Sequence, residues 1–138
     1  MKKIGFLGLG VMGLPMAKNI IKGTGQAIMA FDVAEDRLKA IEEAGGIPVK
    51  DQDDIYRSCD IILQMLPTHP IIIHSVEQAI KLGKPGNIII DCSSTAPDII
   101  QDLYQKVKAA GMSLLDSPVS GGNPMAAAGT LAIMTGGD

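Results

Sequence analysis

Three glycines near the amino terminus have the spacing of a phosphate-binding loop. Gly8, Gly10 and Gly13 form G-x-G-x-x-G between the apolar run 4–7 and a helical pattern that begins at Leu14. In a dinucleotide site the first glycine allows a tight turn, the second lets the backbone approach a pyrophosphate, and the third allows close packing of helix on sheet. The helix start adds unpaired N–H groups and a partial positive charge. The predicted cofactor contacts in this loop are Gly8, Leu9, Gly10, Val11, Met12 and Gly13.

An acidic residue follows at the distance that a dinucleotide site requires. Asp32 ends a second apolar run, 27–31, and lies 19 residues after Gly13. A carboxylate there can accept hydrogen bonds from an adenosine ribose. We expect a preference for NAD over NADP, because a 2′-phosphate would meet like charge and the nearest arginine, Arg37, is five residues further on. An alternative role for Asp32 is a capping box with Glu35 at the start of the next helix.

A second group of small polar residues lies near the carboxyl terminus. Ser120, Gly121 and Gly122 can present several N–H and O–H donors to one anion, such as a carboxylate. The alternative is a turn that needs glycine for its backbone angles. Asn123 is predicted to be the N-cap of a short helix that includes 125–128.

Two further segments lie at the carboxyl ends of predicted strands and carry candidate cofactor contacts. The first contains Met65, Leu66 and Pro67. The second contains Thr95, which has an alternative role as a helix cap with Asp98 three residues later. His69 and His74 are interpreted as structural, because neither is paired with an acid in a fixed pattern.

The elements that must position these residues are short apolar strands alternating with helices. The predicted strands of the main sheet are 4–7, 27–31, 47–49, 61–66, 88–91 and 112–115. The predicted helices between and after them are 14–21, 35–44, 51–58, 70–82, 97–110 and 125–128, and 129–135 is a predicted seventh strand. This alternation is typical of an α/β fold of the Rossmann type, with a doubly wound, mostly parallel sheet covered by helices on both faces. Because the carboxyl ends of parallel strands bind ligands, the candidate segments are expected to converge there.

Length and composition indicate one globular domain, 1–138, with an aliphatic core. Hydrophobic residues make up 46% of the chain and charged residues 20%, and the net charge is -3. The few aromatic residues are scattered and no basic run occurs, so nucleic acid is not an expected partner. No apolar run is long enough for a membrane span, and the two cysteines lack metal-ligand spacing. We therefore expect a cytoplasmic protein without a metal site, with Cys59 and Cys92 as buried thiols.

Together these segments resemble the β-hydroxyacid dehydrogenase family, which contains enzymes of the 3-hydroxyisobutyrate dehydrogenase and tartronate semialdehyde reductase types. The stretch 8–19 is similar to the cofactor signature of the family almost throughout. Further blocks of the family match the segments 65–67, 91–95, 116–122 and 128–134. The resemblance covers essentially the whole chain.

The resemblance implies reversible hydride transfer between a nicotinamide cofactor and the β-hydroxyl of a small hydroxy acid. The implied cofactor contacts at the strand ends are Leu66, Pro67 and Thr95. The implied contacts to the substrate carboxylate are Ser120, which is also the candidate catalytic residue, Gly121 and Gly122, with Asn123 beside them. A departure lies at Ile71, where some relatives have a polar cofactor contact. The full-length protein is expected to be a homo-oligomer.

The same resemblance assigns proton transfer to a lysine beyond the strand that ends near Met134, on a helix leading to a second, helical domain. The last lysine in this sequence is Lys108, and the sequence ends at Asp138. We therefore expect the 138 residues to be the cofactor domain of a longer dehydrogenase, able to bind cofactor but inactive alone. The alternatives are a non-catalytic dinucleotide-binding module and a relative of 6-phosphogluconate dehydrogenase or of imine-reducing enzymes.

Overall fold

The computed structural model describes residues 1–138, and its main feature is a six-stranded sheet in the order β3-β2-β1-β4-β5-β6. Every neighbouring pair in this sheet is parallel. Its strands are β1 (Ile4–Leu7), β2 (Met29–Phe31), β3 (Ile47–Pro48), β4 (Ile61–Gln64), β5 (Ile88–Asp91) and β6 (Ser113–Asp116). The helices are α1 (Gly13–Thr24), α2 (Glu35–Glu43), α3 (Asp53–Ser58), α4 (His69–Leu82), α5 (Pro97–Ala109) and α6 (Gly122–Ala128). The predicted Rossmann-type α/β fold is confirmed.

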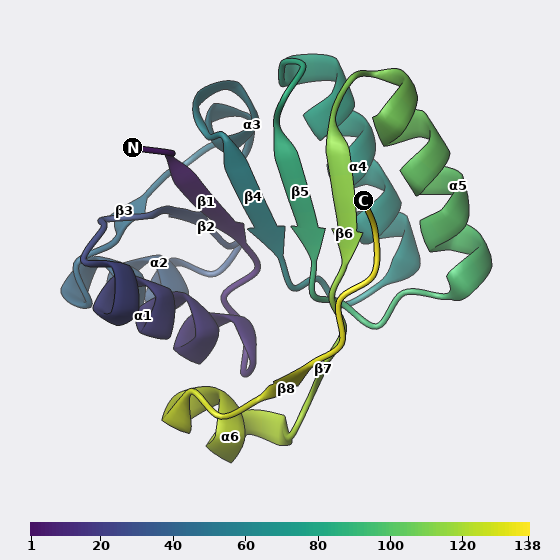
Figure 1. The fold of residues 1–138 in the computed structure, drawn as a ribbon. Coiled ribbons are helices and arrows are strands. Elements are labelled where there is room, and N and C mark those ends of the chain that lie inside the picture. The colour runs from purple at the N-terminus through teal and green to yellow at the C-terminus, as the bar shows by residue number, and fades with distance from the viewer.

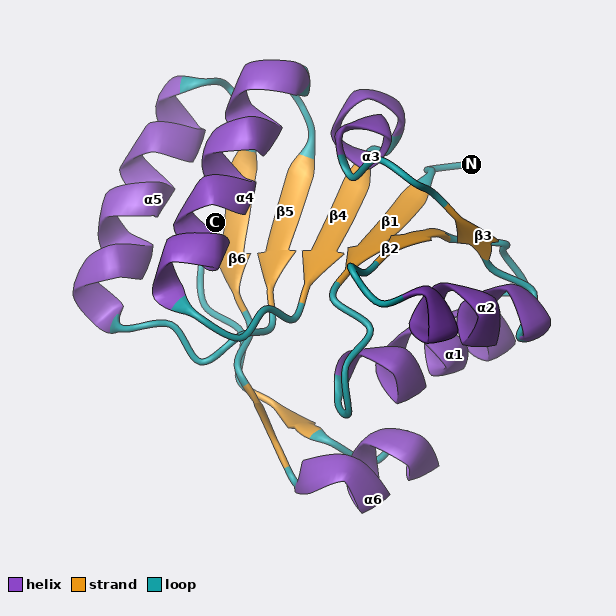
Figure 2. Cartoon of the chain, turned by 180° about the vertical axis from the view of Figure 1, so that it is seen from behind, coloured by secondary structure: helices purple, strands orange, loops and turns teal.

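The helices form layers on the two faces of the sheet (Figures 1 and 2). Helices α3, α4 and α5 cover one face, where they bury the strand residues Leu7, Ile62 and Ile89 in one apolar cluster. Helices α1 and α2 lie on the other face, where a second cluster surrounds Phe6 and Ala30. Burial of these aliphatic side chains is the main stabilising contribution, since the chain has few aromatic residues.

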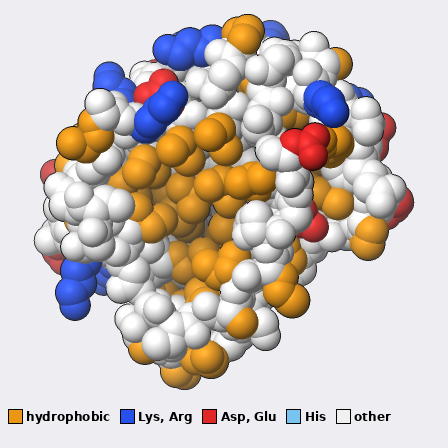
Figure 3. All heavy atoms as spheres, in the orientation of Figure 1, with side chains coloured by type: hydrophobic (Ala, Val, Ile, Leu, Met, Phe, Trp, Pro, Cys, Tyr) orange, Lys and Arg blue, Asp and Glu red, His pale blue; other side chains and the backbone are white.

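Helices lie on both faces of the sheet, as predicted, but on one face they cover only half of it. On the face that carries α1 and α2, the half formed by β4, β5 and β6 has no helix over it (Figure 1). The half-buried side chains of Leu63, Ile90 and Leu115 line a hollow there of about 500 Å³. Figure 3 shows this hollow as a continuous apolar surface. The helix that follows β5 packs on the opposite face, and α6 reaches only the border of the hollow, where Ala126 lines it.

The predicted seventh strand, 129–135, is wrong in length, because only two of its residues form a strand. Only Ala132–Ile133 (β8) forms a strand, and it pairs antiparallel with β7 (Val119–Ser120) in a separate two-stranded sheet. The next contact with the main sheet is a single antiparallel bridge between Asp116 and Gly136. Glycines with positive φ lie at both ends of α6: Gly121, directly after β7, is its N-cap, and Gly129 is its C-cap.

The carboxyl ends of all six parallel strands lie at the same edge of the sheet, where β7, β8 and α6 also lie (Figure 1). Strand β4 ends at Gln64 and not at the predicted Leu66, because the Leu66 N–H donates to the Ser93 Oγ and not to a neighbouring strand. The candidate segments therefore converge at this edge, as predicted. No helix in the structure has the length and apolar character needed to cross a bilayer.

Candidate cofactor site

The three glycines of the loop have different physical reasons for being glycine. Gly8 has φ +94°, and a Cβ on it would collide with the Met65 carbonyl oxygen. A Cβ on Gly13 would collide with the Gly8 carbonyl oxygen, so this glycine allows the close contact of α1 with β1. A Cβ on Gly10 would meet nothing within 4 Å. Packing within the protein therefore explains Gly8 and Gly13 but not Gly10, as expected if the space beside Gly10 receives a ligand.

The turn into α1 presents a row of unpaired donors. The backbone N–H groups of Gly10, Val11, Met12 and Gly13 have no hydrogen-bond partner in the protein. The N-cap of α1 is Met12, whose side chain provides no cap. Unpaired N–H groups and the helix dipole together favour an anion at this position.

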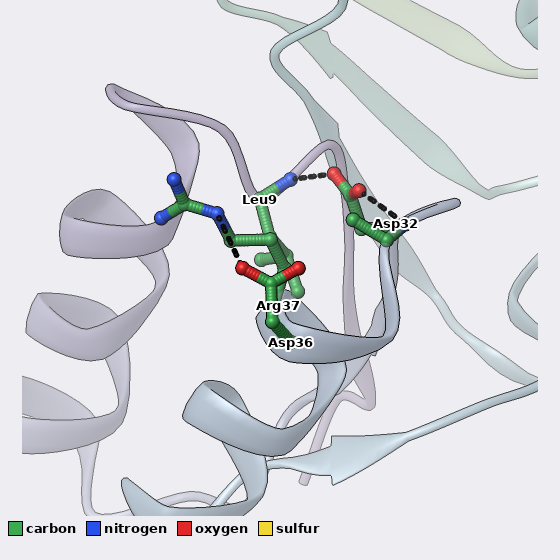
Figure 4. A network of polar contacts seen from close by, with 5 residues as sticks. Leu9, Asp32, Asp36 and Arg37 are labelled. Carbon is green, nitrogen blue, oxygen red and sulfur yellow. Dashed lines mark hydrogen bonds and ion pairs between the residues drawn. The ribbon is translucent and has the colours of Figure 1, made fainter.

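Asp32 holds the glycine loop against the end of β2 (Figure 4). Its Oδ2 accepts the Leu9 N–H at 2.7 Å, and its Oδ1 accepts the Ala34 N–H at 2.9 Å. The predicted alternative of a capping box is wrong, because Ala34 is the N-cap of α2 and no side chain caps that helix. Each carboxylate oxygen retains a lone pair, so Asp32 can still accept hydrogen bonds from a ligand.

One cavity of about 390 Å³ brings most of the predicted cofactor residues together. The predicted residues that line it are Gly8, Gly10, Val11, Met12, Gly13, Asp32, Met65, Leu66 and Pro67. Leu9 does not line it, because its side chain is fully buried in the core and only its N–H faces Asp32. Thr95 and the segment 120–123 also lie outside its lining. Asp32 is the only acidic or basic residue in this lining.

Four further lining residues were not predicted as contacts: Phe31, Val33, Gln52 and Ile71. Val33 is 92% exposed and Ile71 is 46% exposed, which is unusual for aliphatic residues beside a polar loop. The position of Val33 directly after Asp32 was a usable sequence signal. Gln52 has no sequence signal, because only the path of the chain between β3 and α3 brings it to the cavity.

The segment with Ser120, Gly121 and Gly122 is exposed and directly precedes Asn123, which contacts the glycine loop. Gly121 and Gly122 have φ of +134° and +69°, so the turn does require glycine for its backbone angles. The prediction that Asn123 caps α6 is wrong. The N-cap is Gly121, and the Asn123 side chain instead donates to the Val11 carbonyl oxygen at 2.7 Å. This hydrogen bond connects the segment to a residue that lines the cavity.

Thr95 does not cap α5, contrary to the alternative considered for it. The N-cap is Ala96, without a side-chain cap, and the Thr95 hydroxyl donates to Asp91 at 2.5 Å. Of the two histidines, His69 is half-buried at the start of α4 and His74 is exposed on the same helix. Neither lines the cavity.

The two thiols and one carboxyl group have raised pKa values. Burial, with a smaller effect of the Asp91 charge, raises the pKa of Cys92 to about 12. Burial, followed by the Asp60 charge, raises the pKa of Cys59 to about 11. Burial and then the Asp91 charge also raise the pKa of Asp116. Both cysteines are therefore buried neutral thiols at neutral pH, as predicted.

Comparison with known proteins agrees with this geometry. Residues 3–138 match the family described as the NAD binding domain of 6-phosphogluconate dehydrogenase. An NAD-dependent L-serine dehydrogenase of Pseudomonas aeruginosa is 35% identical over 141 aligned residues, which cover 100% of this chain and 47% of that protein. The human mitochondrial 3-hydroxyisobutyrate dehydrogenase is 38% identical, over 97% of this chain and 40% of that protein.

The fold agrees with a solved structure as well. Mycobacterium tuberculosis 3-hydroxyisobutyrate dehydrogenase, determined with L-serine, superimposes with a TM-score of 0.93 at 33% identity. The match covers 100% of this chain and 47% of that one. The chain thus spans less than half the length of each of these relatives.

Proposed function

Because the chain belongs to the β-hydroxyacid dehydrogenase family, whose NAD-binding domain it matches, we propose that it binds NAD as the cofactor domain of a dehydrogenase of small hydroxy acids. The cavity beside the glycine loop is the proposed cofactor site. The open space beside Gly10 carries this proposal, because nothing in the protein itself requires glycine there. The four unpaired N–H groups of the loop are suited to the pyrophosphate.

The residues present fit each part of a dinucleotide. The remaining lone pairs of Asp32 accept hydrogen bonds from the hydroxyl groups of the adenosine ribose. Val33 and Ile71 offer exposed aliphatic surface to the adenine ring, which replaces the polar contact of some relatives at Ile71. Leu66 and Pro67 line the opposite part of the cavity. When bound, the nicotinamide ring supplies a hydride donor or acceptor.

The site favours NAD over NADP, because the only charge that lines the cavity is the Asp32 carboxylate. Arg37 is on α2 and pairs with its neighbour Asp36, with 3.8 Å between Nε and Oδ2 (Figure 4). It lines a neighbouring cavity with Lys18. A 2′-phosphate beside Asp32 would thus meet a like charge without a cation in the same cavity.

On the substrate side, Ser120, Gly121 and Gly122 orient the carboxylate of the hydroxy acid, with Asn123 beside them. The Ser120 hydroxyl and the unpaired N–H groups of Gly121 and Gly122 are the donors for it. 3-Hydroxyisobutyrate and L-serine share the required chemistry, a primary hydroxyl on the β-carbon and a carboxylate. Holding that carbon beside the cofactor is the contribution of these residues to catalysis. The lining of the cofactor cavity contains no lysine, histidine or tyrosine, so proton transfer is assigned to none of its residues.

Calorimetric titration with NAD and NADP tests the proposal. The wild-type protein should bind NAD at least about tenfold more tightly, which corresponds to about 1.4 kcal/mol. Asp32→Asn removes the charge and should reduce this preference to within a few-fold. Glu43→Gln is the matched control, because it removes a charge from an exposed α2 residue that forms no ion pair and lies outside the cavity, so it should leave the preference unchanged. Equal or tighter binding of NADP by the wild type would contradict the proposed role of Asp32.

A further inference from the structure

A fully buried carboxyl group lies beneath the two loops that follow β4 and β5. Asp91 ends β5, is 0% exposed, and has no cationic partner. It accepts instead from Gln64 Nε2 at 3.2 Å, from the Ser93 N–H at 3.2 Å and from the Thr95 hydroxyl at 2.5 Å. A buried carboxylate is unfavourable unless hydrogen bonds compensate it. Gln64 leaves its own buried Oε1 without a partner in this arrangement.

These hydrogen bonds join two loops that are far apart in the sequence. The Ser93 Oγ accepts the Leu66 N–H at 2.9 Å, and the Cys92 N–H donates to the Gln64 carbonyl oxygen at 2.8 Å. The loop after β4, with Leu66, is thus fixed to the loop after β5 through Ser93. Asp91 in turn holds Ser93 and Thr95 in the second loop. The buried Asp91 side chain is therefore hydrogen-bonded to the second loop directly and connected to the first loop through Ser93.

The strand order indicates which half of a bound dinucleotide would lie beside the loops after β4 and β5. Asp32 follows β2 and the glycine loop follows β1, while β4 and β5 lie on the other side of β1. With a ribose at Asp32 and the pyrophosphate at the glycine loop, the second half of the dinucleotide extends toward β4 and β5. Leu66 lines the cavity on that side.

We propose that Asp91 is a positioning residue that fixes the Leu66 and Thr95 loops for the nicotinamide half of the cofactor, an inference that rests on the proposed function. Because the Thr95 proton is donated to Asp91, the Thr95 hydroxyl presents only lone pairs to a ligand. It serves as a hydrogen-bond acceptor for a hydroxyl or amide N–H of that half. Asp91 does not touch the cofactor and acts through Thr95 and Ser93.

The experiment compares a whole dinucleotide with its adenosine half. NAD and ADP are titrated calorimetrically into wild type, Asp91→Asn and Asp116→Asn, with thermal unfolding recorded for each. Asp91→Asn replaces one acceptor oxygen with a donor, so the Kd for NAD should rise at least tenfold while the Kd for ADP changes less than twofold. Asp116 is the Cα partner of Asp91 on β6, and its side chain accepts no hydrogen bond, so Asp116→Asn should leave both constants within twofold of wild type.

A second pair of variants decides the result if Asp91→Asn does not fold. Thr95→Val removes the hydroxyl at a half-buried position and should raise the Kd for NAD but not for ADP. Thr95→Ser keeps a hydroxyl and should have the wild-type Kd for NAD. Equal weakening of NAD and ADP, or NAD binding unchanged in both Asp91→Asn and Thr95→Val, would overturn the inference. If the wild type binds neither NAD nor ADP, the proposed function fails first, and the inference fails with it.

Discussion

Gly10 provides the most direct test of the cofactor site, because its substitution should affect the ligand and not the fold. Gly10 is exposed, its φ is not positive, and a Cβ there would have open space. Gly10→Ala should therefore stabilise the free protein by about 0.4–1 kcal/mol, since the unfolded chain loses conformational freedom. The same methyl group would occupy the space into which the pyrophosphate must come. We expect a rise in the Kd for NAD of at least about tenfold, and a larger rise for Gly10→Val.

Thermal unfolding and calorimetric titration on the same preparations separate these two effects. Gly23→Ala is the matched control, because a Cβ there also has open space but lies on α1, outside the cavity. It should stabilise the protein and leave NAD binding unchanged. Gly13→Ala should instead destabilise the fold, since its Cβ would collide with the Gly8 carbonyl oxygen. A folded Gly10→Val protein with wild-type affinity for NAD would refute the placement of the pyrophosphate.

Three other predictions concern the substrate segment, turnover and the thiols. In a full-length enzyme, Ser120→Ala should raise KM or lower kcat for the hydroxy acid, while the Kd for NAD stays within twofold. Loss of NAD binding with unchanged turnover of the hydroxy acid would assign Ser120 to the cofactor site. Residues 1–138 alone should bind NAD without reducing it when 3-hydroxyisobutyrate or glycerate is added, because no lysine lines the cavity, and measurable NADH formation would contradict this. Burial raises the pKa of Cys59 to about 11 and that of Cys92 to about 12, so neither should react with a thiol reagent at pH 8 until guanidinium unfolds the protein. Because both folded-state pKa values exceed the unfolded value of about 8.5, their contribution to stability is complete below pH 8.5 and should decrease as the pH rises toward 11–12.

The sequence predicted the parts of the site that depend on local pattern. The glycine loop follows from a short strand, three glycines and a helix, and Asp32 from its distance along the chain. The positions of residues that depend on contacts distant in the sequence could not be predicted. Gln52 reaches the cavity only through the path of the chain after β3, and Thr95 turns to Asp91 because that buried carboxyl group needs donors. The two-residue strands of the small sheet are too short to produce a recognisable alternation.

Cofactor preference and loop structure cannot be separated at Asp32. The carboxylate that would select NAD also accepts the N–H of Leu9, inside the glycine loop, at 2.7 Å. Asp32→Ala removes both functions, so it should weaken binding of NAD and NADP alike and give little information on preference. Asp32→Asn removes the negative charge and keeps one acceptor oxygen, so it loses the hydrogen bond from Leu9 or from Ala34 but not both, which is why it is the better test. A protein of this type could therefore change from NAD to NADP without loss of affinity only if the replacement at position 32 still accepts the Leu9 N–H.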